Sequence, residues 1–274
     1  MAADLLTEIV SPDRRLTALA AGPEEGPPVL FLHGVGGGAR LWSRQLRDLG
    51  ARGYRAIALN LPGHGGSAPV EPASVGLYGD ILAGFISMTA LAPPVLVGHS
   101  LGGMVVQSYL ADGLGLSRGV VLAHTSPSFG GRDAAWAGAF VETRLQPLDR
   151  GETMAQVAEW SVPAMMGRDP PPEGVALARR LMAETPPATY RDSLLSMIGF
   201  DRRSALARIG VPALLVAGVL DEMAPAATME KMAQKIAGSE FLCLEGVGHF
   251  AMLERPEAFE AAIAGFLARV VPVG

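Results

Sequence analysis

The sequence predicts a protein of the α/β class, with a mainly parallel central sheet, helices on both faces and an inserted helical cap. Strand and helix segments alternate along residues 29–123 and again along 213–270, which is typical of a parallel sheet covered on both sides. Residues 126–203 contain helical segments separated by prolines and no predicted strand. We therefore expect residues 1–125 and 204–274 to form the core domain and residues 126–203 to form the cap.

Hydrophobic runs and turn residues predict each element in order. The chain begins with a hairpin, whose strands at residues 4–10 and 14–20 flank a turn-type sequence. Short apolar runs, typical of buried parallel strands, then alternate with segments of helical spacing. The predicted core strands are 29–33, 54–59, 95–98, 119–123, 213–217 and 240–244, and the predicted core helices are 41–51, 78–89, 101–111, 226–236 and 256–270. The predicted cap helices are 134–145, 154–160, 175–184 and 190–200.

The composition excludes several classes of function. The 274 residues carry a net charge of −5 without a cluster of Lys and Arg, so we expect no nucleic-acid partner. No apolar run approaches the ~18 residues that span a bilayer, and the N-terminus lacks the basic and apolar segments of a signal peptide. We expect a cytoplasmic monomer or homodimer with no membrane partner. The single cysteine, Cys243, allows no intrachain disulfide and is expected to be buried in a strand.

Residues 95–104 hold the most informative motif. A short apolar strand runs into Gly-x-Ser-x-Gly, centred on Ser100, and directly on into a helix. Such a sharp turn strains the backbone of the serine and lifts its hydroxyl above the sheet. Gly98 and Gly102 supply the small neighbours that the turn needs, and the helix N-terminus favours negative charge on the target. The motif predicts that Ser100 is a nucleophile.

A serine nucleophile needs a general base, and the base needs an orienting acid. His249 follows a strand and a glycine-containing loop at the carboxyl edge of the sheet, where functional sites gather, and it is the predicted base. His124 ends a strand and is a weaker alternative, while His99 is expected to be structural. The acid should follow another strand, after the serine and before the histidine. Asp221 fits this position, with Glu222 as the alternative.

The backbone N–H groups of Val35 and Leu101 are predicted to form the oxyanion hole. Leu101 follows the nucleophile, and Val35 lies in the glycine-rich loop 33–38, where the backbone can come close to a substrate. Methionines and aromatic residues of the cap predict a tolerant apolar pocket. The predicted pocket residues are Gly36, Trp136, Phe140, Arg144, Trp160 and Phe250. No Cys/His set has zinc spacing, so we expect neither a metal nor a cofactor.

With these residues placed, the chain resembles the α/β-hydrolase fold superfamily along nearly its whole length. The matching motifs are His33-Gly34, residues 61–67, residues 98–103, Asp221, and Gly248-His249 followed by residues 253–256. Within the superfamily, residues 144–148 and 200–206 are similar to 3-oxoadipate enol-lactonase-like proteins of the esterase and lactonase branch. That resemblance implies a small lactone substrate that carries a carboxylate.

We therefore expect a carboxylic ester hydrolase that acts on a small-molecule ester or lactone through an acyl-enzyme. Two alternatives stay open. One is a C–C bond hydrolase or lyase acting on a small anionic metabolite, because the motif at residues 61–67 is also seen in lyases of menaquinone synthesis. The other is a non-catalytic protein that keeps the fold and uses the cap as a ligand lid, since the fold alone does not determine function.

Overall fold

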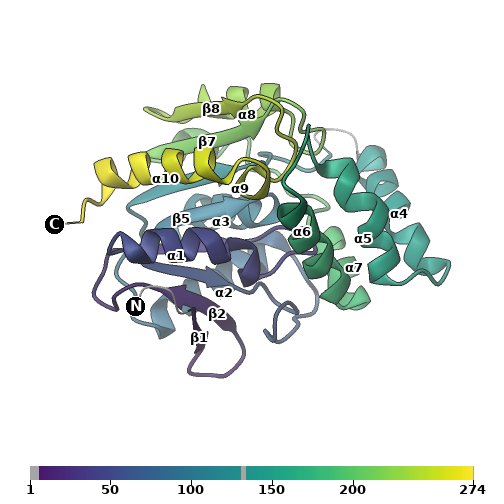
Figure 1. Cartoon of the computed structure of the whole chain (residues 1–274), viewed down its shortest axis with the longest axis horizontal. Coiled ribbons are helices and arrows are strands. Elements are labelled where there is room, and N and C mark those ends of the chain that lie inside the picture. The colour runs from purple at the N-terminus through teal and green to yellow at the C-terminus, as the bar shows by residue number, and fades with distance from the viewer. Residues whose placement is uncertain (1–5, 131–133, 274) are drawn as a thin grey trace.

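The computed structural model describes residues 6–130 and 134–273. Its eight strands form one sheet in the order β1-β2-β4-β3-β5-β6-β7-β8 (Figure 1). Strands β1, β2 and β4 pair antiparallel, and the strands from β4 to β8 pair parallel. The α/β class and the mainly parallel sheet are thus confirmed. The strands are β1 Thr7–Val10, β2 Thr17–Ala21, β3 Pro28–Leu32, β4 Arg55–Leu59, β5 Val95–His99, β6 Gly119–Ala123, β7 Ala213–Gly218 and β8 Glu240–Leu244.

Helices cover both faces of the sheet. In Figure 1, α1 and α10 lie on the near face, while α2 and α3 lie behind it. The core helices are η1 Ala39–Trp42, α1 Ser43–Ala51, α2 Val75–Met88, α3 Leu101–Ala111, η2 Leu206–Arg208, α8 Ala226–Ala233, α9 Ala251–Glu254 and α10 Pro256–Val270. Every predicted core strand and helix is present, with its ends shifted by a few residues. Residues 4 and 5 of the predicted hairpin lie outside the described part of the chain.

Four helices follow β6 and precede β7, and they gather at one end of the sheet (Figure 1). We call them the cap helices: α4 Ala134–Asp149, α5 Met154–Met165, α6 Pro172–Glu184 and α7 Pro187–Ser196. Helices α6 and α7 each begin three residues earlier than predicted, with a proline at the first position. A proline there loses no hydrogen bond, because the first N–H groups of a helix have no partner within it. The proposed division into core and cap domains stays a prediction.

The central strands are buried on both faces. Leu30 of β3 aligns with Ile57 of β4 and Leu96 of β5, and Leu96 aligns with Val120 of β6. All four side chains are buried, as expected for a parallel sheet between two helical layers. Parallel strands end at the same edge, so the residues that follow β3, β5, β6 and β7 meet there.

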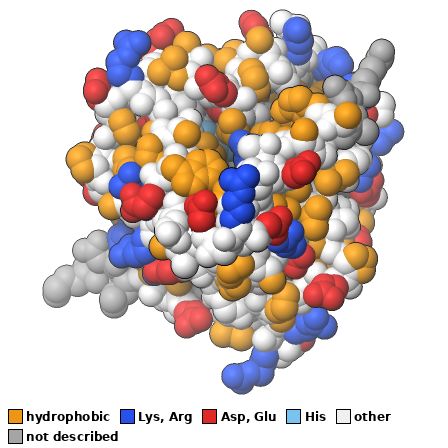
Figure 2. Space-filling model, turned by 90° about the vertical axis from the view of Figure 1, so that its right-hand side faces the viewer, with side chains coloured by type: hydrophobic (Ala, Val, Ile, Leu, Met, Phe, Trp, Pro, Cys, Tyr) orange, Lys and Arg blue, Asp and Glu red, His pale blue; other side chains and the backbone are white. Residues whose placement is uncertain are grey.

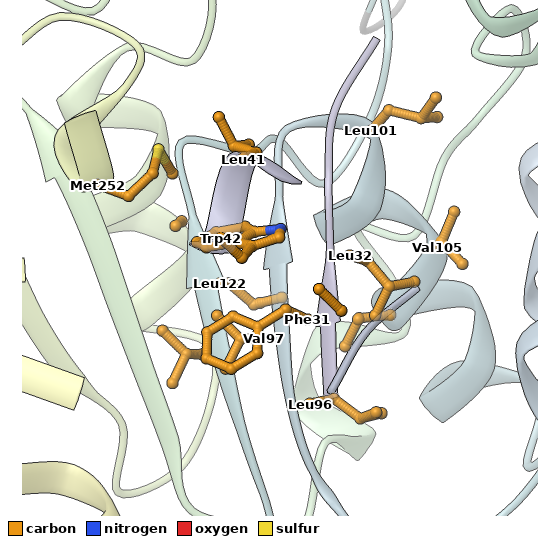
Figure 3. Close-up of a cluster of buried hydrophobic side chains, with 14 of the residues drawn as sticks. Phe31, Leu32, Leu41, Trp42, Leu96, Val97, Leu101, Val105, Leu122 and Met252 are labelled. Carbon is orange, nitrogen blue, oxygen red and sulfur yellow. The ribbon is translucent and has the colours of Figure 1, made fainter. Parts of the chain in front are cut away.

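One face of the sheet packs against an aromatic cluster. Trp42 of η1 lies over Phe31 of β3 with ring centroids 5.0 Å apart, and it stacks on Phe259 of α10 at 6.1 Å. In Figure 3, Trp42 and Phe31 lie on one side of the strands, while Leu101 and Val105 of α3 lie on the other. These contacts fix η1, and with it the glycine-rich loop that precedes η1, against the sheet.

Strand β8 lies at the edge of the sheet, and this corrects one prediction. Cys243 in β8 is only partly buried, not buried as expected. The strand has a neighbour on one side only, so less of each residue is covered. Among the described residues, no helix combines the length and the apolar character that a bilayer-crossing helix requires.

Truncating a side chain in the centre of the sheet is expected to destabilise the protein strongly. Leu96 is 0% exposed in β5, whereas Leu116 is 75% exposed. Leu96→Ala should lower the free energy of unfolding by about 2–5 kcal/mol, through lost burial and a residual cavity. The matched control Leu116→Ala should change it by less than about 0.5 kcal/mol. Urea unfolding followed by circular dichroism measures both, and equal effects would contradict the described packing.

Acid is expected to destabilise the fold through His64, which lies buried in the loop after β4. Its Nδ1 hydrogen bonds the carbonyl of Pro62 at 3.1 Å, and burial lowers the pKa of His64 from 6.5 to about 4. Between pH 6.5 and about pH 4, His64 binds a proton in the unfolded chain but stays neutral in the folded chain. The free energy of unfolding therefore falls as the pH drops. At pH 4 the loss reaches about 3 kcal/mol.

His64→Asn tests this pH dependence, because the Asn amide keeps a donor near Pro62 but does not titrate. Urea unfolding of the wild type and the variant between about pH 4 and pH 7 should give a flatter stability curve for the variant. Parallel curves would show that His64 does not contribute to acid destabilisation.

Candidate active site

Ser100 lies at the sharp turn between β5 and α3. Its backbone has φ 52° and ψ −118°, a region that costs a non-glycine residue roughly 1–3 kcal/mol. The surroundings impose this conformation, because a Cβ on Gly98 would lie 2.6 Å from the carbonyl oxygen of Gly102. A Cβ on Gly102 would lie 2.5 Å from the carbonyl oxygen of Leu32. The strain predicted for the turn is therefore present, and it directs the Ser100 side chain into a cavity.

His249 lies in the loop between β8 and α9, beside the same cavity. Its Nδ1 lies 3.0 Å and 2.9 Å from the two carboxylate oxygens of Asp221, and its backbone N–H donates to the carbonyl of Met165. Among the described residues, Nε2 of His249 has no hydrogen-bond partner, and none joins it to Ser100. Because Nε2 has no partner, it can accept a proton from the cavity side. The missing contact with Ser100 does not argue against this role, since catalytic hydrogen bonds often tighten only once substrate is bound.

Asp221 lies in the turn after β7, and its side chain is 0% exposed. Backbone N–H groups of Met223 and Ala224 donate to Oδ1 at 2.8 Å and 2.9 Å. Burial alone raises the pKa of Asp221, but attraction to His249 and hydrogen bonds from His124 and His249 outweigh it, so the pKa lies far below its usual range. The carboxylate is ionised and can orient His249. Glu222, the alternative acid, is exposed and has no hydrogen bond to His249 within the described structure.

His124 makes a second contact with Asp221. Its Nδ1 lies 2.9 Å from Oδ2 of Asp221, and its side chain is 0% exposed. Its Nε2 accepts a hydrogen bond from the backbone N–H of Ala251 at 3.3 Å. Both ring nitrogens are therefore occupied, which makes His249 the better placed base. The sequence placed His124 beside the site but did not indicate its contact with Asp221.

His99 has the structural position that the sequence predicts. Its Nε2 donates to the backbone carbonyl of His249 at 2.8 Å, and the two rings lie 4.9 Å apart. Burial holds the pKa of His99 well below its usual value, so the ring stays neutral. A Cβ on Gly34 would come within 2.9 Å of the Cβ of Ser100 and 3.1 Å of Nδ1 of His99. Only glycine therefore allows the loop after β3 to approach the serine.

The N–H groups of Val35 and Leu101 are both available for an oxyanion. Val35 lines the cavity beside Ser100, and Leu101 is the first residue of α3, so its N–H has no partner within the helix. Neither N–H donates a hydrogen bond to another described residue. The prediction that Gly36 lines the substrate pocket is wrong, because Gly36 lines a small neighbouring void instead of the main cavity.

The cavity lies between the carboxyl ends of the strands and the cap helices, with a volume of about 580 Å³. Figure 2 views the molecule from the cap side, and hydrophobic side chains flank a hollow on this face. Methionine and aromatic residues form a large part of the wall, and Trp136 and Trp160 are half exposed. The predicted pocket residues that line the cavity are Trp136, Phe140, Arg144, Trp160 and Phe250. Among the described residues that line the cavity, the charged Arg and Glu side chains are those of Arg144 and Glu222.

Glu254 holds the loop of His249, a contact that sequence reasoning missed. Its buried carboxylate accepts N–H groups from Gly248 at 3.0 Å and Phe250 at 2.9 Å, on either side of His249, and from Gly167 at 2.6 Å. The carboxylate thus holds the His249 loop and joins it to the segment after α5. An acidic residue directly after the apolar run at residues 250–253 was the available signal.

His124, Asp221 and His249 also offer ligand atoms within 4.8 Å of one another, a spacing that a metal ion could use. A metal needs a lone pair on each ligand nitrogen. Here the N–H of Ala251 occupies Nε2 of His124, so the ring proton lies on Nδ1 and points at Asp221. The cluster has the donors and acceptors of a hydrogen-bond network.

Two named relatives match most of the chain. A pimeloyl-[acyl-carrier protein] methyl ester esterase from Chromobacterium violaceum is 27% identical over 248 residues, covering 89% of this chain and 95% of the relative. A 3-oxoadipate enol-lactonase from Acinetobacter baylyi is 24% identical over 264 residues, covering 95% and 96%. A solved esterase from Thermogutta terrifontis has a TM-score of 0.84 at 24% identity, covering 97% of this chain and 99% of the esterase.

Residues 29–262 match the alpha/beta hydrolase family as a whole. The match extends from β3 to α10 and so includes the serine turn, the Asp221 turn and the His249 loop. The enol-lactonase and esterase relatives agree with the resemblance seen in the sequence motifs. The chain belongs to the alpha/beta hydrolase family.

Proposed function

We propose that this chain is a serine hydrolase that cleaves a carboxylic ester or lactone. One observation carries the proposal: a strained Ser100 and an Asp221-bound His249 line the same cavity. Val35, which lines this cavity, and Leu101, which follows Ser100, each have an N–H that donates to no other described residue. A nucleophile, a base with its orienting acid and a pair of oxyanion donors are the parts that acyl transfer requires. The names of the esterase and enol-lactonase relatives support the same class of bond.

The mechanism follows from these positions. Oγ of Ser100 attacks the carbonyl carbon while Nε2 of His249 takes the hydroxyl proton, and Asp221 stabilises the resulting imidazolium. The N–H groups of Val35 and Leu101 donate to the tetrahedral oxyanion. His249 then gives its proton to the leaving alkoxide, and an acyl-enzyme remains. Water attacks the acyl-enzyme by the same proton path and releases the acid.

The cavity favours a small and largely apolar acyl compound. Its volume of about 580 Å³ falls within the range of small-molecule sites. The methionine side chains in its wall can adapt to different shapes. We propose a small-molecule ester or lactone as the substrate.

Arg144 supplies a cation to this apolar wall. Its guanidinium lies 3.4 Å from the centroid of the Phe140 ring, and its N–H groups reach the Phe140 carbonyl and the sulfur of Met223. No carboxylate in the described structure forms an ion pair with it. Glu222 is exposed at the same cavity and does not pair with it. A cation without an ion-pair partner at a substrate cavity favours a substrate that carries its own carboxylate.

Replacing the nucleophile or the base should abolish ester hydrolysis. Ser100→Ala and His249→Ala should each lower kcat/KM for p-nitrophenyl acetate and butyrate by at least about a thousandfold. Ser87→Ala, an exposed serine in α2, is the matched control and should keep wild-type activity. Initial rates of nitrophenolate release at equal concentrations of folded protein measure all three.

If either variant keeps most of the activity, the assignment of that residue is wrong. If the wild type hydrolyses neither ester but cleaves a vinylogous diketone, the C–C hydrolase alternative replaces this proposal. Ligand-dependent stabilisation without any turnover would favour the ligand-binding alternative.

Removing the cation at Arg144 should selectively weaken the hydrolysis of carboxylate-bearing esters. We expect Arg144→Ala to lower kcat/KM for mono-4-nitrophenyl adipate roughly tenfold or more, because a charged hydrogen bond is lost. The value for p-nitrophenyl hexanoate, which has the same acyl chain length but no free carboxylate, should change much less. Arg180→Ala, at an exposed position of α6 away from the cavity, is the control. Equal losses for both esters would contradict the carboxylate subsite.

A further inference from the structure

The proposed mechanism leaves one buried imidazole at the site without a role. His124 follows β6 with φ 49°, in a left-handed region that a non-glycine residue adopts only at a cost. Its backbone N–H donates to the carbonyl of Val216 in β7 at 2.9 Å, which continues the ladder between the two strands. The fold thus holds a strained backbone in place, and the side chain lies against Asp221 with no exposure.

The hydrogen bonds of His124 determine its tautomer. The backbone N–H of Ala251 can only donate, so Nε2 of His124 must carry a lone pair. The ring proton is then on Nδ1 and is donated to Oδ2 of Asp221 at 2.9 Å. Burial lowers the pKa of His124 despite the raising effect of Asp221. The ring is therefore a neutral donor of fixed direction.

This one ring joins the acid to the loop that carries the base. Asp221 belongs to the turn after β7, whereas Ala251 lies two residues beyond His249 at the start of α9. His124 binds both from the end of β6. The two elements whose relative position sets the contact between Asp221 and His249 therefore share a third attachment point.

The donors on Asp221 divide between its two oxygens. Oδ1 accepts the N–H groups of Met223 and Ala224, which are fixed by the turn itself, and it also lies 3.0 Å from Nδ1 of His249. Oδ2 is reached by His124 and by His249. Without His124, the hydrogen bond to Oδ2 that is independent of the base is lost, and the carboxylate can rotate away from the direction that His249 needs.

The titratable groups that face His124 are few. Asp221 hydrogen bonds His124, and the centroid of the His249 ring lies 5.8 Å from that of the His124 ring. The His99 ring lies at 6.0 Å, and Glu254 acts on His124 through its charge. Asp221 is the one acid among them that hydrogen bonds His124.

We propose that His124 is a positioning residue, which orients Asp221 and ties it to the His249 loop through a neutral Nδ1–H tautomer. The inference rests on the proposed ester hydrolysis for its kinetic consequence. Because His124 acts through Asp221 on proton transfer, its loss should lower kcat and leave KM nearly unchanged.

Two variants separate orientation from packing. His124→Leu removes the donor, whereas His124→Asn places an amide N–H near the position of Nδ1. With p-nitrophenyl butyrate, we expect His124→Leu to lower kcat by roughly tenfold to a hundredfold, as misplacement of a catalytic group does. Its KM should stay close to the wild-type value, and the pH profile of kcat should shift. His124→Asn should restore most of the lost kcat.

His64→Asn is the matched control, because it replaces another buried histidine that does not line the cavity. It should keep the wild-type kcat at neutral pH. Rates are compared per folded molecule, with circular dichroism giving the folded fraction. Wild-type kcat and pH profile in a folded His124→Leu variant would overturn the proposal, as would equal kcat losses in the Leu and Asn variants.

Nitrogen-15 NMR of the wild-type histidine side chains gives a readout without substrate. We expect the His124 signals of a neutral Nδ1–H tautomer at neutral pH. A protonated ring or an Nε2–H tautomer would overturn the proposal. If the neutral Nδ1–H tautomer is found in a protein that hydrolyses no ester, the assigned tautomer is supported and the proposed function fails.

Discussion

The buried carboxylate of Asp221 is the constraint on which the site depends. A carboxylate without water is unstable unless donors surround it, and here the donors come from three places in the chain. They are the turn of Asp221 itself, the end of β6 through His124, and the β8–α9 loop through His249. Each donor also fixes the element that carries it. The charge that binds His249 therefore also fixes the carboxyl ends of β6 and β7 relative to the β8–α9 loop.

A second buried carboxylate repeats this principle one layer further from the substrate. Glu254 gathers N–H groups on both sides of His249 and one from Gly167, next to the end of α5. The backbone N–H of His249 also donates to the carbonyl of Met165. The base loop is thus bound to the cap as well as to the sheet. A displacement of the cap at this point cannot leave His249 where it is, so cap position and base position are coupled.

The sequence was sufficient for the fold class and for the order of elements, because alternation and the serine turn are local patterns. It was less informative at the edge of the sheet. Cys243 was expected to be buried, but it lies in β8, an edge strand, and is only partly buried. The contact of His124 with Asp221 and that of Glu254 with Gly167 were missed because both are non-local. His124 and Asp221 are 97 residues apart. Only the adjacency of β6 and β7, which a sequence pattern does not specify, brings them together.

Strain and ladder geometry act together at the site. Ser100 and His124 each follow directly after a strand, each has a positive φ, and each donates its N–H to the neighbouring strand, at Ala123 and Val216 respectively. The sheet ladder thus extends one residue past β5 and past β6, and it holds two conformations that an isolated chain would rarely adopt. Stability supplied by the buried strands is used at this edge to fix side-chain directions. A rigid sheet with strained residues at its carboxyl edge therefore holds Ser100 and His124 in fixed directions beneath the cavity.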